Sequence, residues 1–255
     1  MTSLKQRFER FMLSTPGIES IDEILRQRAP IDLQRADYLA CDRRAVIEVK
    51  SLDVNPDYKI QRFLDGLAQA GRLPCTGDTT LAELLCKLPD GQVLFDEARE
   101  RVTKVLDDVV AKADDQTRDT KRIFNITDAV GIVVILNENA TLLYPDISTV
   151  KLFDMLRKQR DGALRYVHNQ VIVLISESHI IDVSEGVIMY NMATVYSEAG
   201  NDIPLATTFV EGLQRRWAAF NNAGYLESSD YWDKFRARDP VKPFNVVRSP
   251  PSGET

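Results

Sequence analysis

The chain has 255 residues, of which 44% are hydrophobic and 27% charged, and its formal net charge is −6. This composition is ordinary for a soluble globular protein, and the length suffices for one sizeable α/β domain or for a core with an inserted subdomain. No apolar run approaches the roughly 20 residues that span a bilayer, and no secretory signal is recognisable, so we expect a cytoplasmic protein with no membrane partner. The 3 cysteines form no CxxC pair and only 2 histidines are present, which argues against a disulfide framework or a zinc site.

The first elements of the chain are predicted to be helices. Residues 3–13 carry apolar side chains at the spacing of a short amphipathic helix. The Thr15-Pro16 pair has the residue types of a helix start, and the pattern predicts a second helix from there to about Arg28.

The stretch 36–52 has two short apolar runs joined by a polar turn, which predicts a β-hairpin with residues 42–43 as its loop. In that register Asp37 lies directly across from Glu48. Because side chains alternate along a strand, Lys50 shares the face of both acids. Both faces are otherwise largely apolar, as in a strand pair inside a sheet that is covered on both sides.

The two facing acids indicate a site for a cation. Directly opposed residues of an antiparallel pair have Cβ atoms roughly 4.5–5.5 Å apart, and like charges there are destabilising unless something compensates. Asp37 and Glu48 therefore favour a hard divalent ion, which takes carboxylate oxygens and water as ligands. Lys50 adds a positive group that could stabilise developing negative charge or help to deprotonate a water.

Asp37, followed after ten residues by Glu48-Val49-Lys50 at the end of an apolar strand, resembles the core motif of the PD-(D/E)xK nuclease superfamily. The resemblance implies a restriction endonuclease-like core and a metal-dependent nuclease with Mg²⁺ or Mn²⁺ as its cofactor. It further implies that Asp37 and Glu48 bind the metal, that the main-chain carbonyl of Val49 is an additional ligand, and that Lys50 assists phosphodiester hydrolysis. The family's proline before the Asp is Ala36 in this chain.

Members of this family often add a metal-ligating Glu from a helix before the first motif strand. This chain offers Glu9, Glu19 and Glu23. A solvent-facing position accounts for each of them equally well, so none is assigned to the site.

The acidic net charge opposes strong binding to nucleic acid, because Lys and Arg contacts to phosphates usually supply most of the affinity. A local basic surface can still exist on an acidic protein, and a solvated face is the alternative explanation for basic residues near the motif. The candidates for contacts with nucleic acid are Arg35, Arg43, Arg44, Lys59 and Arg62.

Beyond the hairpin, helical and strand patterns alternate. Residues 58–72 and 79–125 have helical periodicity, so a helical insertion is expected across 53–125. β-branched runs at 129–136 and 170–176 predict buried strands. The remaining predicted elements are a hairpin partner at 141–144, a helix at 148–160, an extended run at 179–189 and a helix at 205–220.

Two other kinds of site are not predicted. Ser176 and His179 lie close in sequence, but no nucleophile elbow surrounds the serine, which argues against a hydrolase triad. The chain has no GxxxxGK or GxGxxG sequence to hold a nucleotide phosphate.

Together these patterns predict an α/β fold with a mixed central sheet flanked by helices, in a single domain over residues 1–239 with an irregular tail at 240–255. The leading functional hypothesis is a Mg²⁺-dependent nuclease that hydrolyses phosphodiester bonds in DNA, and a homodimer is compatible with it. The alternative is a catalytically silent nuclease-like fold that serves as a binding or assembly module. The acidic charge favours this module, whereas the intact Asp, Glu and Lys set favours the enzyme.

Overall fold

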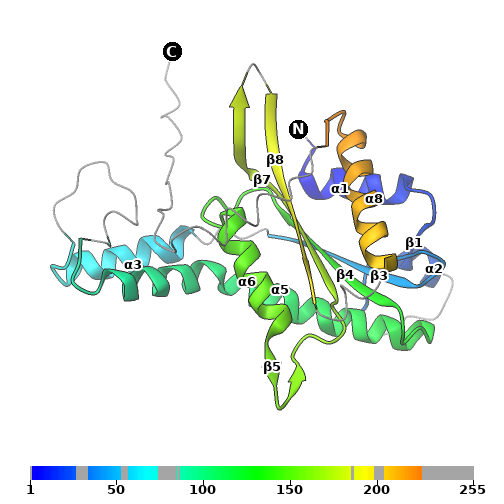
Figure 1. Cartoon of the computed structure of the whole chain (residues 1–255), viewed down its shortest axis with the longest axis horizontal. Helices are drawn as coiled ribbons and strands as arrows, with labels where there is room; N and C mark the ends of the chain where they lie inside the picture. The colour runs from blue at the N-terminus through cyan, green and yellow to red at the C-terminus, as the bar shows by residue number, and fades with distance from the viewer. Residues whose placement is uncertain are drawn as a thin grey trace. The chain divides into compact units, whose positions relative to one another are not determined.

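The structure, a computed structural model, describes residues 2–26, 34–52, 57–73, 85, 87–184, 187–197 and 204–225. These residues centre on a mixed 6-stranded sheet with the strand order β1-β2-β3-β4-β7-β8 and with helices on its faces (Figure 1). The predicted α/β class with a mixed sheet is confirmed. No helix among the described residues is long and apolar enough to cross a membrane.

The sheet has an antiparallel part and a parallel part. β1, β2 and β3 pair antiparallel, β3, β4 and β7 pair parallel, and β8 pairs antiparallel with β7. The strands are β1 Ile18–Ser20, β2 Tyr38–Ala40, β3 Ala45–Ser51, β4 Val130–Asn137, β7 Val171–Ser184 and β8 Val187–Tyr196. A separate hairpin joins β5 (Gln159–Arg160) to β6 (Ala163–Leu164).

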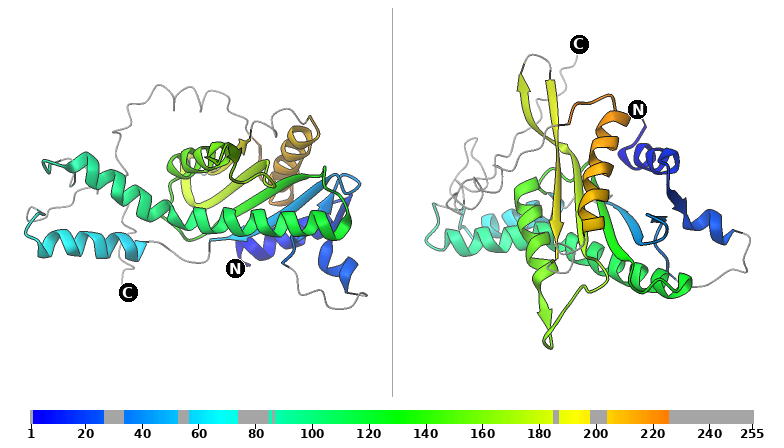
Figure 2. Two further views of the ribbon diagram at one scale, coloured as in Figure 1. Left: turned by 90° about the horizontal axis from the view of Figure 1, so that it is seen from below. Right: turned by 45° about the vertical axis from the view of Figure 1, so that its right-hand side comes forward.

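Helices pack on both faces of the sheet, as the two views of Figure 2 show. On one face α1 (Leu4–Ser14) and α8 (Pro204–Phe220) share a buried apolar cluster with the strands. On the other face lie α2 (Ile21–Leu25) and the C-terminal part of α5 (Gly91–Phe124), together with α6 (Pro145–Arg157). The long apolar strands in the middle of the sheet are therefore buried on both faces, as their β-branched composition requires.

The chain divides into two compact units. One is built from Met1–Asn55 and Thr103–Glu227 and contains the sheet, and the other is built on Pro56–Val102. The second unit contains α3 (Asp57–Gln69) and the first part of α5, so the expected helical stretch is helical where it is described. Within that unit the Arg101 guanidinium lies 4.9 Å from the centre of the Phe63 ring. The predicted tail at 240–255 lies outside the described residues.

The predicted helix at 15–28 is wrong at residues 15–20 and is confirmed only at Ile21–Leu25. α1 ends at Ser14, the hydroxyl of its C-cap Thr15 donates to the Phe11 carbonyl at 2.8 Å, and Gly17 then turns the chain with a φ of +78°. Ile18 pairs with Ala40 of β2, and only the short α2 follows. Pairing with a neighbouring strand therefore overrides the local helical pattern.

The predicted hairpin partner at 141–144 is also wrong. The Asn137 side chain accepts a hydrogen bond from the Ala140 amide at 2.9 Å and donates to the Ala140 carbonyl at 3.2 Å. This side chain closes a turn that leads into α6 instead of a returning strand. Other predicted elements are confirmed with small shifts of their ends, namely the strands at 129–136 and 170–176 and the helices at 3–13, 58–72 and 205–220.

Candidate active site

The β2–β3 hairpin has the predicted register, but its last strand pair is Ala40–Ala45, so residues 41–44 form a four-residue loop instead of the predicted two-residue loop. The Arg44 amide donates to the Cys41 carbonyl at 3.1 Å, which closes the turn. Between them Asp42 and Arg43 have φ angles of 54° and 64°. Positive φ at both central residues gives a turn whose twist matches that of the flanking strands, so the turn fixes the register of the hairpin.

This register places the two acids of the motif opposite each other. Leu39 pairs with Val46, and the Asp37 amide donates to the Ile47 carbonyl at 3.1 Å. The strand pairs end at Tyr38–Ile47, and just beyond them the side chains of Asp37 and Glu48 hydrogen-bond to each other. Both acids share the face on which Leu39 and Val46 are buried with α2. The side-chain pairing predicted from the sequence is therefore present in the structure.

Asp37 remains exposed to solvent. Its Oδ2 accepts a hydrogen bond from the Val49 amide at 2.8 Å, which anchors the carboxylate to the β3 backbone. The loss of hydration on its protein side raises the pKa of Asp37 above its ordinary value, while the Val49 amide and the Lys50 charge oppose that rise. Asp37 is thus an anchored carboxylate that solvent and ligands can reach.

Glu48 is the buried member of the pair, with only 2% of its surface exposed. Its Oε1 lies 2.5 Å from Nζ of Lys50, whereas its Oε2 is buried and receives no hydrogen bond from an N–H or O–H group of another residue. The Glu48 carboxyl group also forms a side-chain hydrogen bond with Asp37. Burial, followed by the negative charge of Asp37, raises the pKa of Glu48 to about 8, and Lys50 limits the rise. In the metal-free protein at neutral pH, Glu48 therefore carries a proton that it can share with Asp37.

Two residues of α5 hold this arrangement in place, and sequence reasoning missed both. Lys50 donates a hydrogen bond to Oε1 of Gln116, and Gln116 donates through Nε2 to the Arg35 carbonyl at 2.8 Å. One helical turn later, the Thr120 hydroxyl accepts from the Ala36 amide at 2.7 Å. The spacing of Gln116 and Thr120 was the available signal, but it acquires meaning only when α5 is known to pack on the motif strands.

None of the three predicted helical glutamates joins the carboxylate pair. Glu19 lies on β1 and accepts two hydrogen bonds from Arg43, at 3.2 and 2.8 Å. The Glu23 amide is bound by the N-cap of α2, and its side chain is exposed. The charge of Glu9 acts on Tyr38, which belongs to the core on the opposite face of the sheet. The described residues contain no cluster of three or more metal-ligating side chains.

The predicted basic surface is only partly assembled. Arg35 pairs with Asp22 at 2.9 Å, and Arg43 pairs with Glu19 at 2.8 Å. Arg44 is exposed at the hairpin turn, where its Nε donates to a backbone carbonyl at 3.3 Å. Lys59 and Arg62 belong to the unit built on Pro56–Val102, where Arg62 lies over the Tyr58 ring at 5.7 Å.

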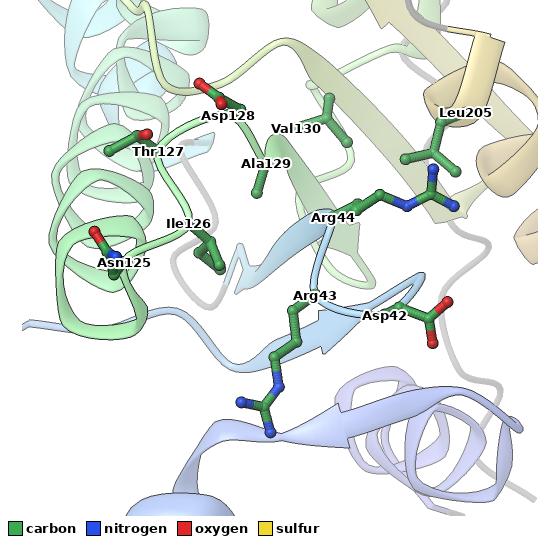
Figure 3. A pocket seen from close by; sticks show the side chains of 10 residues that line it. All are labelled: Asp42, Arg43, Arg44, Asn125, Ile126, Thr127, Asp128, Ala129, Val130 and Leu205. Atoms are coloured by element: carbon green, nitrogen blue, oxygen red, sulfur yellow. The ribbon is translucent and has the colours of Figure 1, made fainter.

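A pocket of about 330 Å³ lies at the hairpin turn and not at the carboxylate pair (Figure 3). Arg43 and Arg44 line it, together with the acids Asp42 and Asp128. Glu48 lies four positions after Arg44, which is roughly 13 Å along an extended strand. We place the candidate site at the carboxylate pair, because the buried oxygen of Glu48 lies there and mixed opposite charges line the pocket.

Ser176 and His179 do come together, but in a structural network. Nδ1 of His179 lies 3.2 Å from the Ser176 hydroxyl, and its Nε2 lies 2.7 Å from the Thr141 carbonyl. Because a carbonyl can only accept, Nε2 carries the proton and Nδ1 accepts from a hydroxyl. The Asn137 amide also donates to the Ser176 hydroxyl at 3.2 Å, so the group ties β7 to the turn that follows β4.

The donor set of the carboxylate pair fits a hard divalent cation. It offers an accessible carboxylate on Asp37 and a buried oxygen on Glu48. Mg²⁺ commonly uses one or two protein carboxylates and keeps several waters.

Comparison with known proteins finds no matching family model, no matching curated protein and no matching solved structure. The functional assignment therefore depends on the geometry of this site and on the motif.

Proposed function

We propose that this protein is a metal-dependent nuclease that hydrolyses phosphodiester bonds in DNA. The observation that carries the proposal is the Asp37–Glu48 pair, in which the two carboxyl groups contact each other and no N–H or O–H group of another residue donates to the buried Oε2 of Glu48. Without metal the two carboxyl groups share a proton, and a bound cation would take the place of that proton between them. When bound, Mg²⁺ or Mn²⁺ supplies Lewis-acid polarisation of the phosphate and activation of a water.

Each residue of the motif has a role in this proposal. Asp37 and Glu48 hold the ion, with the Val49 carbonyl as the further ligand that the family resemblance implies. Asp37 is anchored by the Val49 amide at 2.8 Å, so its carboxylate needs little reorganisation to bind. The Lys50 ammonium is held between Glu48 and Gln116, where it can stabilise the negative charge that develops on the phosphate during attack by water.

The membership in the PD-(D/E)xK superfamily, with its restriction endonuclease-like core, is part of the same proposal. Three observations support it: the register of the motif hairpin, the place of Glu48 and Lys50 on a strand inside a mixed sheet, and the helices on both faces of that sheet. Alanine at position 36 in place of the family's proline does not disturb the hairpin, because the Ala36 amide is free to donate to Thr120.

One observation favours the second candidate, a catalytically silent binding or assembly module. The net charge is −6, and two arginines near the motif are paired with acids, Arg43 with Glu19 of β1 and Arg35 with Asp22 of α2. Paired arginines contribute less to phosphate binding than free ones, because the existing ion pair must be broken or shared.

A cleavage assay on supercoiled DNA, linear duplex, single-stranded DNA and RNA tests the proposal. We expect cleavage of DNA with Mg²⁺ or Mn²⁺ that stops in EDTA and is lost in Asp37→Asn and Glu48→Gln. Glu9→Gln, which alters an acid on the opposite face, is the matched control and should cleave normally. Cleavage that survives Glu48→Gln would refute this site. A folded protein that neither cleaves any substrate nor binds Mn²⁺ supports the module.

A further inference from the structure

The two edge strands of the sheet, β1 and β8, differ in length and in charge. The β1 edge has 3 residues, and its middle residue Glu19 is bound by Arg43. A short, charged edge prevents another strand from adding to the sheet. The opposite edge is β8, which has 10 residues with the sequence VIMYNMATVY and contains no charged residue and no proline. Among the described residues, β8 pairs only with β7.

β8 is partly buried on both faces of the sheet. Asn191 and Val195 are buried on the face that carries α6, whereas Met192 and Tyr196 pack against the core on the face of α8. The Thr194 hydroxyl accepts a hydrogen bond from Gln214 of α8 at 2.8 Å. In the right-hand view of Figure 2, β8 runs between α6 and α8. An uncharged edge strand of this length presents a row of unpaired backbone groups with which another strand can pair.

The flank of α6 beside this edge carries exposed apolar side chains. Lys151 of α6 pairs with Asp107 of α5 at 3.0 Å, so the Lys151 side of α6 faces α5 and not the β8 edge. Phe153 follows two residues later, about 200° further around the helix, and points away from α5. Phe153 is 38% exposed with the Arg157 guanidinium 4.9 Å from its ring centre, and Val150 is 42% exposed.

We propose that two copies of this chain associate through β8, edge to edge and antiparallel, so that the sheet continues across a twofold axis. Because β8 carries no charge, pairing the strand with itself places no like charges opposite each other. A twofold axis perpendicular to the sheet brings the two α6 helices together on the same face, and their Phe153 flanks then pack over the seam. Asp154 and Arg157 of this flank have opposite charges, which suits a self-complementary contact. This proposal is independent of the nuclease activity.

Sedimentation equilibrium over a range of concentrations tests the association. We expect a species of twice the chain mass of 28.8 kDa. Tyr190→Lys changes a 47% exposed side chain on β8, and Phe153→Asp places a charge on the α6 flank. Each should weaken dimerisation at least tenfold. The matched control is Leu13→Asp, because Leu13 is 57% exposed near the end of α1 that leads into β1, the opposite edge strand of the sheet.

Hydrogen exchange followed by mass spectrometry locates the interface directly. In the wild-type protein the β8 amides should exchange slowly at high concentration and faster on dilution, while the β4 amides stay constant. This measurement needs no variant, so it decides the question even if a variant fails to fold. A monomer at every concentration overturns the proposal. So does a dimer that both variants leave intact, or one in which β8 exchange does not respond to dilution.

Discussion

Nζ of Lys50 lies 2.5 Å from Oε1 of Glu48, yet the other oxygen of the same carboxyl group is buried and receives no hydrogen bond from an N–H or O–H group of another residue. The single ammonium therefore compensates only part of a buried acid that faces a second acid. Removing one acid from a repelling pair should increase the free energy of unfolding of the metal-free protein. Removing a residue that supports the fold should decrease it. Stability measurements can thus distinguish a ligand site from a structural ion pair.

The first prediction concerns the stability of Glu48→Gln without metal. Burial raises the folded-state pKa of Glu48 to about 8 from an ordinary value of 4.5, so the folded protein keeps a proton that the unfolded chain releases. The contribution of Glu48 to stability is present below pH 4.5 and is lost as the pH rises to about 8. We expect Glu48→Gln to match the wild type near pH 4 and to exceed it at pH 8 by about 1–3 kcal/mol in urea unfolding.

Glu19→Gln is the control for this experiment. The hydrogen bond from Arg43 lowers the pKa of Glu19, so its contribution is present at neutral pH and is lost in acid. Glu19→Gln should therefore be slightly less stable than the wild type at pH 8. If Glu48→Gln also loses stability at pH 8, Glu48 serves the fold and not a ligand.

The second prediction concerns Gln116 as a positioning residue. Gln116→Leu removes the acceptor that holds Lys50 and the donor to the Arg35 carbonyl, but it leaves both carboxylates in place. Loss of such an outer support typically costs 10–100-fold in activity or metal affinity. We expect kcat for DNA cleavage to fall about 10–100-fold while Mn²⁺ affinity, measured by calorimetry, changes little.

Gln92 provides the matched control, because it lies exposed near the start of the same helix and donates a hydrogen bond to a neighbouring acid, Asp96. Gln92→Leu should leave kcat unchanged. An equal loss of kcat in both variants would mean that the helix is perturbed as a whole. Full activity in Gln116→Leu would show that Lys50 does not depend on this contact.

The motif hairpin could be predicted from the sequence because its register is local. Residues 42–43 form a turn of a known type, and the alternation of side chains then determines that Asp37 faces Glu48. The same reasoning fails for β1, because Ile18 becomes part of a strand only through pairing with Ala40 of β2. It also fails for Gln116, whose contact with Lys50 spans 66 positions of the chain and depends on how α5 crosses the sheet.

The third prediction concerns Lys121 of α5, which is 4% exposed and donates to the His168 carbonyl at 3.4 Å. Burial lowers the pKa of Lys121 to about 8 from 10.5, so the unfolded chain binds a proton that the folded protein releases. The titration of Lys121 should therefore increase the free energy of unfolding as the pH rises from about 8 to 10.5. We expect Lys121→Met to abolish that rise in thermal unfolding and to leave the melting temperature at pH 7 equal or higher. Lys112→Met, at an exposed position of the same helix, should keep the rise.

The last prediction tests how an acidic protein contacts DNA. Arg43 and Arg44 lie side by side at the hairpin turn, and Arg44 has no acidic partner among the ion pairs of the described residues. A plot of the logarithm of the binding constant for duplex DNA against the logarithm of the salt concentration has a negative slope. If both arginines contact phosphates, removing each one should make that slope less steep by about 0.9. We expect Arg44→Gln to reduce the slope by about one unit in a Glu48→Gln background with Ca²⁺ present. Arg43→Gln should have a smaller effect because Glu19 already binds Arg43.

Arg160→Gln is the comparison for this measurement, since Arg160 is 81% exposed on the separate β5–β6 hairpin. That variant should not change the slope, because nothing places it beside the motif. Equal slopes in all the variants would remove the hairpin turn from the DNA-binding surface. No measurable affinity at low salt for either DNA or RNA would instead favour the assembly module, because a nuclease must hold a phosphate backbone against the charge of −6 carried by the whole chain.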